Sequence, residues 1–341
     1  MNMEEFVALT APDRYDFSND GANSEYNKLD NFKNDLEKFF VYMAIAKDYK
    51  REEEDIMKYG ADYSQKCKML FKNIPDSDSE SKLLQDIYKQ LWYDETSLKY
   101  CYTEQGNVQG ETMNSVNTTL KAWYVLVEDE EKVQREERKN IKGQKISIRY
   151  ILSRYVKNTL DQKELFDKVE GLRFFISIYH TLGNFIPVPT GCNAPRGTGK
   201  LKDYWDLTLK VIYDYYNDYN DIGDNIMDIV SGGGGRTKID KDELYKRYKQ
   251  WLDSFHEGDS KKEAWKRFVE KNYLQDFVDC NTDGSYGMPK ELWKGHFSGE
   301  VLPTEIEQIE HFFVNASCWV TARSTRMLLR LRKILREKEN A

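Results

Sequence analysis

The residue types best suited to chemistry gather in one polar segment of the sequence, residues 180–206. His180 is one of only four histidines in the chain, and an imidazole can act as acid, base or metal ligand near neutral pH. The other polar and charged candidates in the segment are Asn184, Asn193, Arg196, Lys200 and Asp206. Amides can orient a substrate or a histidine, and cations set among glycines can neutralise a phosphate. We therefore predict the functional centre here, with a purely structural loop as the alternative.

The same segment is rich in residues that interrupt helices. Three of the seven prolines and four glycines fall between residues 183 and 199. This density predicts a long polar loop, because proline removes a backbone donor and glycine favours turns. Asp206 follows the loop at the start of a predicted helix, where its carboxylate could hold Arg196 or His180 in place.

Four short motifs extend the candidate site beyond this segment. They are Gly110–Ser115 (GETMNS), Tyr179–Pro189 (YHTLGNFIPVP), Asp203–Leu209 (DYWDLTL) and Ala264–Glu270 (AWKRFVE). Together they resemble an uncharacterised bacterial family across residues 105–335, a family that has no established activity. The resemblance implies a bacterial, cytosolic protein. It also links Asn114 and Ser115 to His180 as partners in one site.

A second resemblance concerns the string from His180 to Asn184 (HTLGN) followed by Asn193. It resembles the signature of HNH-type nuclease domains, in which a preceding Asp-His element supplies the histidine that activates water beside a metal ion. In this chain no histidine precedes His180, and no Asp-His pair occurs. The resemblance therefore implies either a local match or a fold without its usual catalytic base. No cofactor is predicted, and a divalent metal ion stays an open alternative.

A third resemblance joins Arg173 to His180, which are separated by six residues. This spacing resembles the arginine–histidine element of helical HEPN-type ribonucleases, which need no metal ion. It implies that the two side chains meet in a cleft and cut RNA through its 2′-hydroxyl. Phe174 follows the arginine, where that family often has a polar residue.

The C-terminal residues combine leucines with a series of cations, Arg323, Arg326, Arg330 and Lys333. Their spacing predicts an amphipathic basic helix, which could bind RNA, DNA or an acidic protein partner. The alternative is that these cations only stabilise the C-terminal end of the helix and keep it solvated.

Metal binding is not predicted at any particular set of residues. Asp279–Gly284 matches the first half of a calcium-binding loop, but Lys290 occupies the position of the bidentate carboxylate. A turn rich in Asn and Asp is therefore predicted there. The five cysteines are scattered and form no C-x-x-C pair, which indicates reduced thiols and no zinc framework.

The bulk composition limits the classes of protein to be considered. Apolar residues make up 40% and charged residues 32% of the 341 residues, as in globular proteins. The net charge of −7 argues against a generally basic surface for nucleic acid. The sequence has neither a signal peptide nor an apolar run long enough to cross a membrane, so a cytoplasmic location without a membrane partner is expected.

The elements that must position the candidate residues are predicted to be mainly α-helical, with little strand. Apolar residues recur at helical spacing over 30–70, 81–102, 146–156, 165–179, from 203 onward, 240–255 and 261–278, and in two helices after Pro303. Phe185–Val188 is the clearest strand signal. Three regions are predicted: a helical region 1–104, a core helical domain 105–230 with the polar loop, and a helical region 231–341 after a Gly-rich connector.

These patterns favour a bacterial nucleic-acid-processing or phage-defence-type protein with a nuclease-like centre at His180. In this hypothesis Arg173 and Asn184 assist the histidine, while the remaining candidates bind or orient the substrate. The competing hypothesis is a non-enzymatic interaction or regulatory protein, in which the loop is structural and the basic helix docks a partner.

Overall fold

The computed structural model describes residues 3–4, 82–92, 96–114, 119, 122, 171, 175, 182–189, 204–217, 241–256 and 260–340. In this part the chain is mainly helical, as predicted. The helices are α6 (Lys82–Leu91), α13 (Trp205–Asn217), α15 (Lys241–Asp253), α16 (Lys261–Lys271) and α17 (Ile306–Glu339). The 3₁₀ helices are η2 (Thr96–Cys101), η3 (Leu182–Asn184) and η4 (Gln275–Phe277). The strands are β1 (Gly110–Thr112), β2 (Phe185–Pro187), β3 (Val278–Cys280) and β4 (Tyr286–Pro289).

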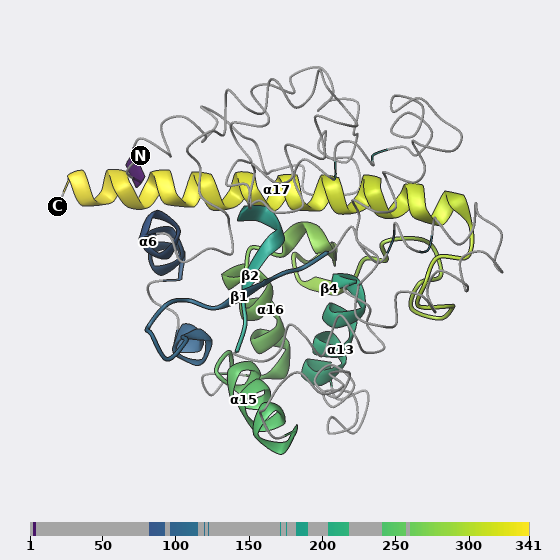
Figure 1. Cartoon of the computed structure of the whole chain (residues 1–341), viewed down its shortest axis with the longest axis horizontal. Coiled ribbons are helices and arrows are strands. Elements are labelled where there is room, and N and C mark those ends of the chain that lie inside the picture. The colour runs from purple at the N-terminus through teal and green to yellow at the C-terminus, as the bar shows by residue number, and fades with distance from the viewer. Residues whose placement is uncertain are drawn as a thin grey trace, which may run out of the picture.

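Helix α17 is the longest described element, with 34 residues, and it crosses the full width of the molecule in Figure 1. The sequence predicted two helices here, but no glycine or proline interrupts residues 304–339 and the helix is continuous. Its start is fixed by Gln308, whose side-chain oxygen accepts hydrogen bonds from the backbone N–H groups of Thr304 and Glu305 at 2.7 and 3.3 Å. Every residue from Ala316 to Thr325 is buried.

The turn η3 packs against the buried middle of α17 and leads directly into a small antiparallel sheet. In this sheet β1 pairs with β2, with Glu111 opposite Ile186 and Thr112 opposite Phe185. The strand predicted at residues 185–188 is thus confirmed, whereas no strand was predicted at β1. Its first residue is Gly110, and a Cβ at that position would overlap the Phe185 ring.

The predicted helices at residues 240–255 and 261–278 correspond to α15 and α16. Helix α16 begins at its N-cap Ser260, whose Oγ accepts a hydrogen bond from the Glu263 N–H at 3.4 Å. It ends seven residues earlier than predicted, at Lys271, because Tyr273 adopts a left-handed conformation with φ of 57°. The predicted Asx turn closes a hairpin between β3 and β4, where Asp283 Oδ1 accepts a hydrogen bond from the Ser285 N–H at 2.9 Å.

One continuous core includes members of all three predicted regions, for example Tyr88, Phe185 and Phe312. Its aromatic rings meet directly: Tyr88 stacks on Phe185 with centroids 4.5 Å apart, and Phe312 lies edge-on to Tyr204 at 5.5 Å. The division at residues 104 and 230 stays a prediction. The helices predicted over 30–70 and 146–156 and the connector at 231–235 lie outside the described residues, and of the helix predicted over 165–179 only Gly171 and Phe175 are described.

Within the described ranges, no helix combines the length and the apolar character needed to cross a bilayer.

The described cysteines differ in exposure, and a prediction about thiol chemistry follows. Burial raises the pKa of the Cys101 thiol well above its ordinary value and that of Cys318 to about 12, whereas Cys280 is exposed on β3. Iodoacetamide added to the native protein near pH 8 should therefore alkylate Cys280 while sparing Cys101 and Cys318. Peptide mass spectrometry measures the three sites, and urea-unfolded protein, in which all three should react, is the control. Fast labelling of native Cys318 would contradict the buried position of this face of α17.

Candidate functional site

The structure describes three of the predicted site residues, Asn114, Asn184 and Asp206. All three are buried, with at most 1% of their surface exposed. The remaining candidates lie outside the described residues: Arg173, His180, Asn193, Arg196, Lys200 and Ser115. The contacts described below are therefore those of the buried residues that surround the segment following His180 in the sequence.

Asn114 and Asn184 are brought together across 70 residues of sequence. The Asn184 Nδ2 donates to the Asn114 carbonyl oxygen at 2.8 Å, and the Asn114 N–H donates to Asn184 Oδ1 at 3.1 Å. In addition, the Met113 N–H donates to the Asn184 carbonyl oxygen at 2.7 Å. These bonds continue the β1–β2 ladder beyond the strand ends, so the amide of Asn184 holds the two segments together.

The side chain of Asn114 also fixes the start of α13. Its Oδ1 accepts a hydrogen bond from the Trp205 N–H at 3.0 Å, which satisfies one of the free donors at the N-terminus of this helix. Asn114 thereby connects β1, η3 and α13 at one point. Thr119 reaches the same helix start, because its hydroxyl donates to the Tyr204 hydroxyl at 3.3 Å.

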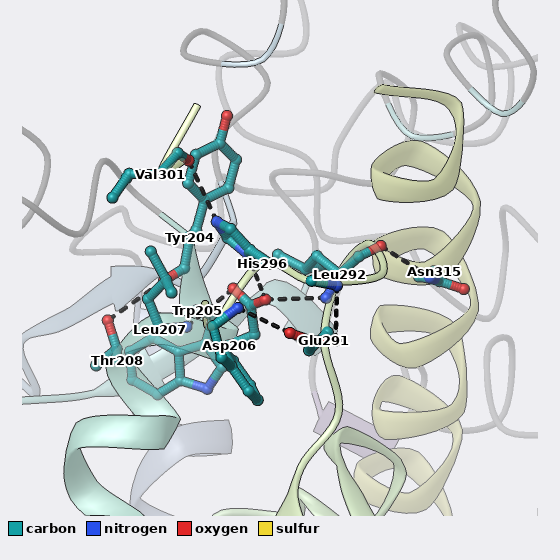
Figure 2. A network of polar contacts seen from close by, with 12 residues as sticks. Tyr204, Trp205, Asp206, Leu207, Thr208, Glu291, Leu292, His296, Val301 and Asn315 are labelled. Carbon is teal, nitrogen blue, oxygen red and sulfur yellow. Dashed lines mark hydrogen bonds and ion pairs between the residues drawn. The ribbon is translucent and has the colours of Figure 1, made fainter. Parts of the chain in front are cut away.

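Asp206 forms a buried hydrogen-bonded pair with His296, which sequence reasoning missed. Figure 2 shows the carboxylate between the first turn of α13 and the loop before α17. Its Oδ2 accepts hydrogen bonds from His296 Nδ1 at 2.6 Å and from the Leu292 N–H at 2.9 Å, and its Oδ1 accepts from the Leu207 N–H at 2.9 Å. Asp206 was predicted to hold Arg196 or His180, and its observed partner is 90 residues away along the chain.

His296 has no free ring nitrogen in this arrangement. Its Nε2 lies 3.2 Å from the carbonyl oxygen of Val301, and its side chain is fully buried. Both ring nitrogens thus lie within hydrogen-bonding distance of an oxygen atom. The ring also stacks on Trp293 with centroids 3.5 Å apart, and the Tyr204 ring packs edge-on with its centroid at 5.1 Å. Figure 2 shows Tyr204 next to His296. The pair therefore fastens residues 291–301 to α13.

Arg323 is the second polar residue that the sequence did not place in this region. It is fully buried in the middle of α17, and its guanidinium donates to the backbone oxygens of Leu182, Gly183 and Phe185. The prediction that it lies on a basic surface is therefore wrong. The sequence feature that could have indicated the burial of Arg323 is its small neighbours, since Ala322, Ser324 and Thr325 leave room for another segment to approach the helix.

The other predicted cations of α17 also differ in environment. Arg326 pairs with Asp276 of η4, with Nε 2.7 Å from Oδ2, and is only partly exposed. Arg330 and Lys333 are exposed, and Lys333 lies 3.8 Å from Glu337. A basic surface on this helix is therefore limited to its last turns, where Arg336 is exposed as well.

Among the described residues, no group of three or more His, Cys, Asp or Glu side chains is arranged to hold a metal ion. The resemblances to an uncharacterised bacterial family, to HNH domains and to HEPN ribonucleases stay predictions from the motifs. Comparison of the chain with protein-family models, with curated proteins and with solved structures found no match.

Proposed function

We propose that the protein processes nucleic acid in a defence-type role, with a metal-independent, nuclease-like centre at His180. The observation that supports this most is the anchoring of the main chain directly after His180. Every residue from Leu182 to Pro189 is buried. The segment is held by the amide of Asn184, by pairing with β1 and by Arg323. A general acid or base depends on such a frame, because small misplacements of a catalytic group lower the rate steeply.

The described residues change the roles assigned to three candidates. Asn184 and Asp206 use their side-chain oxygens within the fold, and Asn114 uses its Oδ1 in the same way. We therefore assign these residues to the framework of the fold instead of to contact with substrate. The groups proposed to touch RNA are His180 and Arg173, with Asn193, Arg196 and Lys200 at the phosphates.

The proposed reaction is cleavage of RNA through its own 2′-hydroxyl. His180 takes the proton of the 2′ oxygen, which forms a bond to phosphorus while the bond from phosphorus to the 5′ oxygen breaks. The 5′ oxygen takes up a proton from solvent. Arg173 stabilises the negative charge that grows on the phosphoryl oxygens, as cations do in phosphoryl transfer.

Labelled RNA and DNA, each incubated with the full-length protein in EDTA and in Mg²⁺, test this proposal. We expect cleavage of RNA that is unaffected by EDTA, and no cleavage of DNA. His180→Ala should lower the rate by about 10²- to 10⁴-fold without a change in thermal unfolding. His311→Ala is the matched control, since His311 is half exposed on α17 and should leave the rate unchanged.

Cleavage of either nucleic acid only in Mg²⁺ would instead favour the HNH-like alternative. No cleavage in any condition would refute an enzymatic centre. The second candidate function, a non-enzymatic interaction protein, would then be preferred. It is favoured by one observation, the use of Asn114, Asn184 and Asp206 within the fold.

A further inference from the structure

Arg323 lies at the centre of the described structure without a carboxylate partner. Its Nε donates to the Asn272 carbonyl oxygen at 2.9 Å. Its Nη1 donates to the carbonyl oxygens of Gly183 at 2.8 Å and Phe185 at 2.7 Å, and more weakly to that of Leu182 at 3.4 Å. In the described part of the chain its Nη2 has no partner. All four acceptors are backbone oxygens, and three belong to the segment that follows His180.

The guanidinium remains a cation at neutral pH. Burial lowers the pKa of Arg323 to about 9, while the nearby Tyr273 and Tyr88 act in the opposite direction. A buried charge without a counter-ion is unfavourable, and hydrogen bonds from the charged group to oxygens offset this. An apolar side chain would fill the same space without that penalty, so simple packing does not account for an arginine here.

Gly183 allows the segment 182–185 to lie close enough to α17 for Arg323 to reach its backbone oxygens. A Cβ on this residue would overlap the Val320 carbonyl oxygen and the Ser324 hydroxyl, so the backbone of η3 rests directly on the helix. The carbonyl groups of a single 3₁₀ turn have few partners of their own. Arg323, one residue before Ser324, satisfies them with a forked donor that lysine cannot reproduce.

We infer that Arg323 is a positioning residue of the centre at His180, because its buried guanidinium holds the backbone oxygens of Leu182, Gly183 and Phe185 in place. This inference rests on the proposed function, since it assigns Arg323 a role in the reaction. Arg323 does not touch the substrate in this scheme. It acts through the main chain that begins two residues after His180.

Hydrogen exchange of the full-length protein measures the anchoring itself. The Met113 and Val188 amides report on the segment, because they donate to the Asn184 and Gln109 carbonyl oxygens across the sheet. Arg323→Gln should make both amides exchange at least about tenfold faster, and Arg323→Lys should cause a smaller increase. Arg326→Gln is the matched control: it breaks the ion pair with Asp276 three residues further along α17 and should leave both amides unchanged.

Cleavage kinetics measure the positioning. Arg323→Lys should fold and lower kcat by about tenfold to a hundredfold, with KM and the shape of the pH–rate profile unchanged, because the acid–base group is still His180. Exchange no faster in the Arg323 variants than in Arg326→Gln would overturn the inference, as would faster exchange with an unchanged kcat. If the unaltered protein cleaves nothing, the proposed function fails and the positioning role fails with it. The exchange data then still show whether Arg323 anchors the segment.

Discussion

Alanine in place of Gly183 is expected to lower the free energy of unfolding by about 3 kcal/mol, because the added methyl group has no room. The Ser324 hydroxyl could rotate away from it. The Val320 carbonyl oxygen cannot, since it belongs to the backbone of α17, so η3 and the helix must separate. Separation would also lengthen the hydrogen bonds from Arg323 to the Gly183 and Phe185 oxygens. The loss therefore combines steric strain with weakened bonds to a buried charge.

Urea unfolding followed by tryptophan fluorescence measures this difference. Gly106→Ala is the matched control, because Gly106 has a φ of 76° but nothing within 4 Å of the added Cβ. It should lose only about 1 kcal/mol, the strain of a left-handed alanine. The double variant Gly183→Ala with Ser324→Ala should recover only a minor part of the lost free energy of unfolding, since the added methyl group still overlaps the Val320 carbonyl oxygen. Equal losses for Gly183→Ala and Gly106→Ala would mean that the segment does not rest on α17 as described.

Local patterns in the sequence predicted the helices well. Apolar residues at helical spacing located α13, α15, α16 and α17, and proline with β-branched residues marked β2. The predicted bounds of the helices were less accurate. For example, α16 ends before its apolar spacing does, because Tyr273 adopts a left-handed conformation. Periodicity carries no information about such a single backbone conformation.

The polar frame of the site could not be predicted in the same way. Asn114 with Asn184, and Asp206 with His296, are pairs separated by 70 and 90 residues, and spacing along the chain does not identify such partners. Arg323 was placed on a basic face because its charge matched the exposed cations that follow it. Burial of an arginine depends on which carbonyl oxygens a distant segment presents, and this is a property of the folded structure.

The second large effect is expected at Asp206. Asp206→Ala should lower the free energy of unfolding by about 3–5 kcal/mol, because it leaves the buried His296 ring and the Leu292 N–H without their acceptor. Asp206→Asn keeps one oxygen and should lose less. Glu243→Gln is the matched control, since Glu243 pairs with Arg247 on the exposed face of α15 and should contribute at most about 1 kcal/mol.

A double-mutant cycle of Asp206→Asn with His296→Gln isolates the pair, and urea unfolding of all four proteins should give a coupling energy of about 1–3 kcal/mol. Coupling near zero would show that the two side chains do not interact in solution.

The same variants separate a role in the fold from a role in the reaction. Because both oxygens of Asp206 accept hydrogen bonds within the fold, any cleavage rate, expressed per folded molecule, should be unchanged in Asp206→Asn. A large loss of rate in a stably folded Asp206→Asn protein would instead return this carboxylate to the reacting centre, and it would mean that the carboxylate leaves His296 when substrate binds.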